Sequence, residues 1–192
     1  MRISMKKLKY RKIILISLAL PLIAALIACS GNASNSQQPE TITGKVIGII
    51  DGDTYDLLTP EKKTVRIRTA AIDAPERGMP FYKVSKQYLA KLCFGKTVTL
   101  KEDAKDRYGR IVAFTYLPDS TEVSAEMLKA GMAWHFKKYN TDEDLAQLEI
   151  EARTARKGLW EDKDPMEPWR NRKLHRSGIS TKDSFDIQPG QH

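Results

Sequence analysis

KVIGIIDGDTYDLLTPEKKTVRIRTAAI, residues 45–72, contains three short runs rich in β-branched residues, separated by turn residues. Runs of this kind predict strands, and three in succession predict a meander. Between the first two runs stand Asp51, Gly52 and Asp53. In an extended strand the two carboxylates would lie on one face and repel, so we expect a turn or a cation there. Because Asp-Gly is also a strong hairpin signal, the pair alone leaves a simple turn open.

The next stretch, PFYKVSKQYLAKLCFG at residues 80–95, predicts a helix. Val84, Tyr88 and Leu92 recur at helical spacing, and Gly95 follows the last turn, where glycine commonly ends a helix. Cys93 lies on the apolar side of this helix. Its predicted role is therefore that of a small buried hydrophobic residue rather than a nucleophile.

Two further strands, TVTLKED at 97–103 and IVAFTYL at 111–117, are joined by a charged segment. A short helix is predicted over SAEMLKA at 124–130, and a longer one from Thr141, which resembles a capping box with Asp144. Five strands with a helix between the third and the fourth are the order of an OB-type barrel. We therefore predict an α+β fold, a five-stranded OB-type β-barrel with about three helices, over residues 42–170. The pattern then fades, and residues 171–192 are predicted to be a mobile C-terminal tail.

The chain begins with a basic segment and a long apolar run. Residues 1–12 hold six basic and no acidic side chains, and IILISLALPLIAALIA then extends to residue 28. This is the form of a signal peptide, although the run is close to the length of a single membrane span. LIAC at 26–29 resembles a bacterial lipobox. We expect a lipoprotein signal peptide over residues 1–28, lipidation of Cys29 and a flexible linker over 29–41; an ordinary secretory signal or an uncleaved anchor is the alternative.

The expected cleavage changes what the charge implies. The full sequence has a formal net charge of +8, which by itself favours a nucleic-acid partner. Removal of residues 1–28 would leave 26 basic against 24 acidic side chains, so net charge is weak evidence for any partner. With Cys29 lipidated, Cys93 has no cysteine to pair with, so no internal disulfide is expected. We expect an exported monomer that is anchored in the cell envelope by its lipid, with release into the extracellular medium as a further possibility.

Three segments supply residue types that suit phosphodiester chemistry. They are DGDTYDL at 51–57, VRIRTAAIDAPE at 65–76 and DRYGR at 106–110. Carboxylates can hold a hard divalent cation, and guanidinium groups match two phosphate oxygens at once. Each segment alone is as well explained by a turn or a solvated charge, but their combination favours a catalytic site. The candidate residues are Asp51, Asp53, Arg68, Asp73, Glu76, Asp106, Tyr108 and Arg110.

These motifs, in this order, resemble the staphylococcal nuclease family over residues 42–160. The resemblance implies that Asp53, Asp73 and the backbone carbonyl of Ala74 hold Ca²⁺, with Asp51 supporting the loop. Glu76 matches the family's proposed general base. The resemblance further assigns the scissile phosphate to Arg68 and Arg110, and substrate binding to Arg107, Tyr108 and Tyr139.

Two positions depart from the family pattern. Ala74 replaces a threonine, but the family uses the backbone carbonyl there, which alanine retains. Lys137 replaces a second pocket tyrosine, which weakens the expectation of stacking on a terminal base. Among the remaining candidates, His135 and His175 have no evident partner and are predicted to lie on the surface. Trp160 and Trp169 are predicted to pack in the core.

The resemblance implies a calcium-dependent nuclease that hydrolyses DNA and RNA at the 5′ P–O bond and leaves 3′-phosphate ends. The alternative is a surface lipoprotein of the same fold that binds nucleic acid without cutting it. The presence of every charged catalytic position in this sequence argues against that alternative. A purely structural or adhesive lipoprotein would leave the carboxylates and arginines unexplained.

Overall fold

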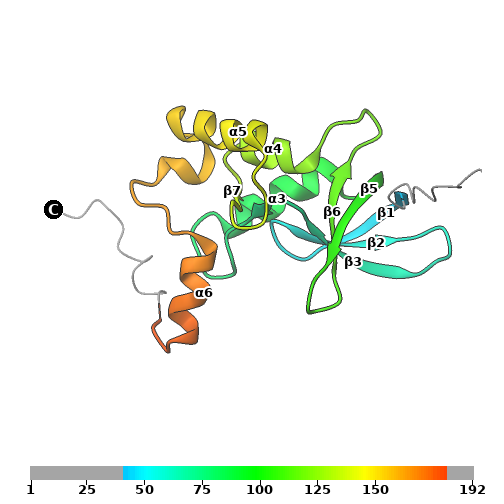
Figure 1. Ribbon diagram of the computed structural model, residues 1–192, viewed down its shortest axis with the longest axis horizontal. Helices are drawn as coiled ribbons and strands as arrows, with labels where there is room; N and C mark the ends of the chain where they lie inside the picture. The colour runs from blue at the N-terminus through cyan, green and yellow to red at the C-terminus, as the bar shows by residue number, and fades with distance from the viewer. Residues whose placement is uncertain (1–40, 181–192) are drawn as a thin grey trace, which may run out of the picture. The chain divides into compact units, whose positions relative to one another are not determined.

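Five strands close into a barrel in the computed structural model, which describes residues 41–180 apart from the side chains at positions 102 and 103. The strand order is β1-β2-β3-β6-β5; β3 and β6 pair in parallel, and the other neighbouring strands are antiparallel (Figure 1). The predicted α+β class and OB-type barrel are confirmed. The strands are β1 (Thr41–Ile49), β2 (Thr54–Leu58), β3 (Thr64–Thr69), β5 (Thr97–Lys105) and β6 (Ile111–Tyr116).

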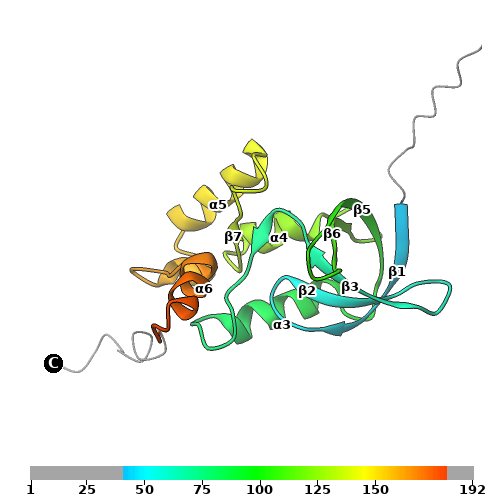
Figure 2. The same ribbon diagram turned by 60° about the horizontal axis from the view of Figure 1, so that its bottom comes forward.

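Four α-helices and a short 3-10 helix accompany the barrel within residues 41–180. They are α3 (Tyr82–Cys93), α4 (Val123–Lys129), α5 (Glu143–Thr154), the 3-10 helix (Gly158–Glu161) and α6 (Pro168–Arg176). As predicted, α3 stands between the third and fourth barrel strands. The predicted tail boundary at residue 171 falls inside α6, so residues 171–176 are helical. In both views α5 and α6 lie at the end of the domain opposite the β2–β3 hairpin (Figures 1 and 2).

Helix α3 packs against one side of the barrel. Its buried face is shifted by one residue toward the C-terminus from the predicted face of Val84, Tyr88 and Leu92. Ser85, Leu89 and Cys93 are its buried residues, whereas Val84 is 46% exposed. Ser85 can be buried because its hydroxyl donates a hydrogen bond to the carbonyl of Met132, at 2.7 Å. Cys93 is a free thiol in the core, and burial raises its pKa to about 12, which keeps it protonated and unreactive.

Helix α5 and the 3-10 helix enclose a second, aromatic cluster. The cap of α5 is Asp142, whose carboxylate accepts hydrogen bonds from the backbone N–H groups of Asp144 and Leu145, so the predicted cap at Thr141 is one residue early. Trp160 is buried here, as predicted, with its ring centroid 4.4 Å from that of Trp134. The half-buried Trp169 completes the cluster from α6.

A small second sheet joins the barrel to the helical end of the domain. It pairs β4 (Ile72–Asp73) with β7 (Trp134–His135) in antiparallel fashion. The prediction that His135 lies on the surface is wrong: its side chain is 2% exposed, and its Nε2 lies 2.8 Å from Oδ1 of Asn140. The sheet buries His135 because Trp134 and His135 pair directly with Asp73 and Ile72. His175, in contrast, is exposed on α6.

The predicted signal peptide, the lipidation site at Cys29 and all of the predicted linker except Thr41 lie outside the described residues. The same holds for residues 181–192 of the predicted tail. Between residues 41 and 180, no helix has both the length and the apolar character needed to cross a bilayer.

Candidate active site

One wide cleft contains nearly all of the candidate residues. Its volume is about 1690 Å³, and its walls come from β2, β3, β4, β7, the β5–β6 loop and α6. The predicted metal-binding, catalytic and substrate-binding residues all line it, together with Asp51. Pockets for small molecules typically have volumes of about 300–1,000 Å³. This cleft is larger and open, so it can accept part of a polymer.

The β1–β2 turn places the two aspartates of the opening motif. The backbone N–H of Asp53 donates to Oδ1 of Asp51 at 3.1 Å, so the turn interpretation of Asp-Gly is correct for the backbone. Gly52 lies against α3, and a methyl group at this position would overlap the hydroxyl of Ser85 and approach Cβ of Ala74 to 2.7 Å. The glycine therefore allows the turn to pack tightly beside the segment that carries Asp73 and Ala74.

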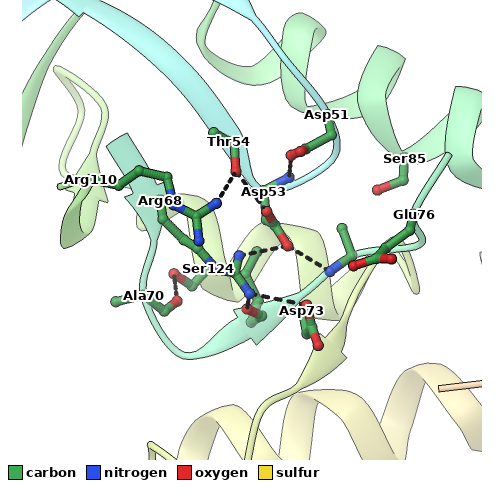
Figure 3. Close-up of polar contacts among 12 residues, drawn as sticks. Asp51, Asp53, Thr54, Arg68, Ala70, Asp73, Glu76, Ser85, Arg110 and Ser124 are labelled. Carbon is green, nitrogen blue, oxygen red and sulfur yellow. Dashed lines mark hydrogen bonds and ion pairs between the residues drawn. The ribbon is translucent and has the colours of Figure 1, made fainter. Parts of the chain in front are cut away.

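Arg68 draws the two predicted metal ligands together. Its Nη1 lies 2.6 Å from Oδ2 of Asp53, and its Nη2 lies 3.0 Å from Oδ1 of Asp73 (Figure 3). The backbone N–H of Ala74 also donates to Oδ2 of Asp53, at 2.8 Å. Although Nη1 is in ionic contact, it makes no well-directed hydrogen bond and is buried. The structure thus brings Asp53 from the β1–β2 turn, Arg68 from β3 and Asp73 from β4 into one ionic group.

The structure adds Arg172, which sequence analysis did not single out. From α6, its Nη2 lies 2.6 Å from Oδ2 of Asp73, and its Nη1 lies 2.6 Å from Oε1 of Glu76. Arg172 and Asp73 are 99 positions apart in sequence, so no local pattern links them. The one available signal was Pro168 after Glu167, because proline favours the first position of a helix.

Burial and mutual repulsion shape the protonation of the three aspartates. Burial, with the charge of Asp53, raises the pKa of Asp51 to about 6. Burial would also raise the pKa of Asp53, but the charge of Arg68 and the Ala74 hydrogen bond outweigh it and hold that pKa below its usual value. For Asp73, burial prevails over the hydrogen bonds from Arg172 and raises the pKa. The pKa values of Asp51 and Asp73 are therefore raised first by burial and second by the negative charge of Asp53.

Replacing Asp51 with asparagine is expected to stabilise the metal-free protein. The amide oxygen can still accept from the N–H of Asp53, while the repulsion between the two carboxylates disappears. Because the pKa of Asp51 is raised from 3.8 to about 6 on folding, its ionisation costs stability progressively between these two pH values and the cost is complete above about pH 6. We expect the free energy of unfolding to rise by about 1 kcal/mol at pH 8 in chelator, and the gain to vanish near pH 4. Urea unfolding at both pH values measures this; a variant less stable than wild type at pH 8 contradicts it.

The β5–β6 loop supplies the other predicted arginines. Asp106 holds the loop: its Oδ1 accepts from the backbone N–H groups of Tyr108 and Arg110, and its Oδ2 accepts from Nε of Arg110 at 2.7 Å. Nη1 of Arg110 lies 3.5 Å from the hydroxyl of Thr54, which itself donates to Asp53. The Thr54 side chain therefore lies between Arg110 and the carboxylate of Asp53. Arg107 lies further out, with its Nη2 2.7 Å from the phenol oxygen of Tyr108.

The two tyrosines predicted to bind substrate, Tyr108 and Tyr139, both line the cleft. Tyr108 and Tyr139 are 69% and 70% exposed, so both rings are accessible to a ligand. Tyr139 contacts Phe136 edge to face, with the ring centroids 4.9 Å apart. Lys137, which departs from the family pattern, forms an ion pair with the buried Glu149 at 3.1 Å. The lysine therefore has a structural partner in this protein.

A divalent cation fits the donor set around Asp53 and Asp73, although the donors are few. Nowhere in residues 41–180 do three or more His, Cys, Asp or Glu side chains form a cluster able to enclose a metal ion. The two buried carboxylates, with the Ala74 backbone next to Asp73 in the chain and in contact with Asp53 through its N–H, make an oxygen-donor set. Such a set suits a hard cation completed by water, and the flexible coordination of Ca²⁺ tolerates it better than the strict octahedron of Mg²⁺.

The fold and the cleft together define a class. A closed OB-type barrel is a frequent nucleic-acid binder, and carboxylates and arginines gathered in one open cleft suit phosphodiester hydrolysis. Comparison with known proteins agrees. The family model described as "Staphylococcal nuclease homologue" matches residues 66–162. The chain belongs to the staphylococcal nuclease family.

Individual relatives extend the match beyond the family model. The chain is 44% identical to an "Uncharacterized endonuclease" of Escherichia coli over 128 residues, which is 67% of this chain and 83% of the relative. It is 40% identical to a "Micrococcal nuclease" of Shigella flexneri over 147 residues, covering 71% and 84% of the two chains. A second "Uncharacterized endonuclease", from Haemophilus influenzae, is 40% identical over 162 residues, covering 83% and 85%.

Proposed function

We propose that this protein is a calcium-dependent nuclease that hydrolyses DNA and RNA at the 5′ P–O bond and leaves 3′-phosphate ends. The observation that carries the proposal is the group formed by Asp53, Arg68, Asp73 and Glu76 within one open cleft. Family membership and the names of the relatives support nuclease activity. Three parts of the proposal need direct tests: the dependence on Ca²⁺, the cleavage of both DNA and RNA, and the identity of the bond that is broken.

Each side chain has a role that its position supports. Asp53, Asp73 and the Ala74 carbonyl would hold Ca²⁺, which when bound supplies a positive charge that polarises a phosphate oxygen. Glu76, 36% exposed at its side chain, can reach a water in the cleft and accept its proton. Arg68 and Arg110 would donate hydrogen bonds to the phosphate as negative charge develops, a contribution of about 3–4 kcal/mol for a well-placed donor.

The substrate residues extend this site along the polymer. Arg107 and Tyr108 lie together on the β5–β6 loop, where a charge and a ring can contact a phosphate and its base. Tyr139, which follows β7, offers a second exposed ring in the lining of the same cleft. Because Lys137 replaces the second pocket tyrosine and forms an ion pair with Glu149, we propose that stacking on a base in this pocket depends on Tyr139 alone.

The deciding experiment incubates the purified protein with plasmid DNA and with RNA, in Ca²⁺, in Mg²⁺ and in excess chelator, and identifies the product ends. Calcium-dependent cleavage with 3′-phosphate ends would support reaction, metal and bond together. Better cleavage in Mg²⁺ would count against Ca²⁺ as cofactor. A folded protein that binds both polymers and cuts neither would favour the non-catalytic binding alternative.

We further propose that the mature protein is a monomer tethered to a membrane by lipid on Cys29. The lipobox resemblance of LIAC and the polar segment after it support this proposal. Mass spectrometry of the N-terminal peptide, in wild type and in a Cys29→Ala variant, tests the lipid. An unmodified or uncleaved N-terminus in the wild type would contradict it.

A further inference from the structure

Arg172 occupies the position of a counter-cation between two active-site carboxylates. Its Nη1 and Nη2 lie 2.6 Å from Glu76 Oε1 and from Asp73 Oδ2, respectively, and Nη1 also lies 3.2 Å from Asp73 Oδ1. These contacts come from α6, outside the barrel, at the end of the domain where α6 lies beside the segment that carries Glu76 (Figures 1 and 2). The guanidinium therefore links α6 to the centre of the site.

Both oxygens of Asp73 are already engaged by guanidinium groups. Oδ2 accepts from Arg172, and Oδ1 accepts from both Arg68 and Arg172. A metal ion approaches a carboxylate oxygen through the same lone pairs that these N–H groups use. These three N–H groups occupy three of the roughly four lone-pair sites of the carboxylate, and a cation at the remaining site on Oδ2 would lie beside the positive guanidinium of Arg172. Cation binding at Asp73 therefore opposes the contacts that the arginines make with it.

Arg172 is the one that can leave. The Arg68 side chain is 14% exposed, lies on a barrel strand, and is also held by Asp53 and by the carbonyl of Ile72. The Arg172 side chain is 33% exposed, and within residues 41–180 its hydrogen bonds and ion pairs are with Asp73 and Glu76. Its departure moves a half-buried side chain or a short helix, whereas departure of Arg68 would break its contacts with Asp53, Asp73 and the Ile72 carbonyl together.

We propose that Arg172 competes with the metal ion for Asp73, so that metal binding and the docking of α6 oppose each other. The inference rests on the proposed function in one respect, the assignment of Asp73 as a metal ligand. It adds a residue that sets the metal affinity of the site. Coupling of this kind is reciprocal. The free energy by which docked Arg172 weakens metal binding equals the free energy by which bound metal weakens the docking of α6.

The first test measures metal affinity, without any activity assay. Ca²⁺ is titrated calorimetrically into the full-length protein in detergent, as wild type, Arg172→Gln and Arg170→Gln. Arg170 is exposed on the same helix, so its variant removes an equal charge without touching the carboxylates and corrects for long-range attraction. Arg172→Gln is expected to bind Ca²⁺ at least about fivefold more tightly than Arg170→Gln, the lower end of typical coupling between sites.

The second test uses the wild type alone, so it stands even if a variant folds poorly. Hydrogen exchange is followed at the amides of α6 with and without Ca²⁺. Added Ca²⁺ is expected to speed exchange in α6, because the contacts of Arg172 are lost, and to leave the barrel strands unchanged or slower. Unchanged or slower exchange in α6 on addition of saturating Ca²⁺ would overturn the proposal.

The outcomes separate this inference from the proposed function. If wild type binds Ca²⁺ and Arg172→Gln binds it no more tightly than Arg170→Gln, competition is overturned and the calcium assignment stands. If only Arg172→Gln binds Ca²⁺, competition is supported and stronger than expected. If no variant binds Ca²⁺, both the calcium assignment and the competition fall. An Arg172→Lys variant, which keeps the charge but loses the fork, is expected to lie between wild type and Arg172→Gln.

Discussion

A Glu76→Gln variant is expected to lose about 10³-fold in turnover on DNA while its fold stays intact. Glu76 is the carboxylate with the most exposed side chain in the ionic group, at 36%, so a water in the cleft can reach it. Glutamine keeps the shape and can still accept the hydrogen bond of Arg172, but it cannot take a proton from water. The loss should therefore fall on the chemical step rather than on substrate binding, and KM should change little.

The measurement is steady-state cleavage of a short labelled duplex in Ca²⁺, with circular dichroism and thermal unfolding as checks of the fold. Glu143→Gln is the matched control, because Glu143 is an exposed acid in the first turn of α5. The control should retain the wild-type rate. Turnover within about tenfold of wild type in Glu76→Gln would exclude Glu76 as the base, since general-base catalysis contributes about 10²–10⁴-fold.

The barrel and most of the site could be predicted from the sequence because the patterns that indicate them are local. The strands show alternation and β-branched residues, and the motifs at 51–57, 65–76 and 106–110 each lie within one turn or strand end. Asp53, Arg68 and Asp73 meet because the β1–β2 turn, β3 and β4 converge in this fold. Once the strand order is known, their proximity follows.

The parts that sequence analysis missed depend on contacts between distant segments. Helix α6 has a mostly basic sequence, PWRNRKLHR, without the apolar stripe that usually predicts a helix. Its position is fixed by Trp169, which stacks on Phe136 with ring centroids 5.4 Å apart, and by the ion pairs of Arg172. The position of His135 was predicted wrongly for the same reason, because its pairing with Ile72 and its contact with Glu149 join segments far apart in the sequence.

Replacing Arg68 with alanine is expected to lower the free energy of unfolding by about 3–5 kcal/mol in chelator at pH 8. The side chain of Asp53 is 9% exposed and that of Asp73 is 1% exposed, and Arg68 contacts both. Removal of the guanidinium leaves two buried carboxylates with less compensation, and loss of a buried partner is far more costly than loss of an exposed one. Urea unfolding with chelator measures the change.

The expected pH dependence identifies the cause of that loss. In the wild type the charge of Arg68 overcomes burial and holds the pKa of Asp53 below its unfolded value, so this carboxylate stabilises the fold above that value and less so as pH falls. Without Arg68, burial prevails and the folded protein favours protonated Asp53, which becomes available toward acidic pH. The difference between wild type and variant should therefore shrink from pH 8 to pH 5.

Arg66 provides the control for Arg68, because it lies two positions earlier on the same strand and also pairs with an aspartate. Its side chain is 50% exposed and that of its partner Asp56 is 21% exposed, so Arg66→Ala is expected to cost about 0–1 kcal/mol. Addition of Ca²⁺ should restore part of the stability lost in Arg68→Ala and none of that lost in Arg66→Ala, since the cation can replace the charge only beside Asp53 and Asp73. Equal losses in the two variants would show that the buried carboxylates do not depend on Arg68 for their charge balance.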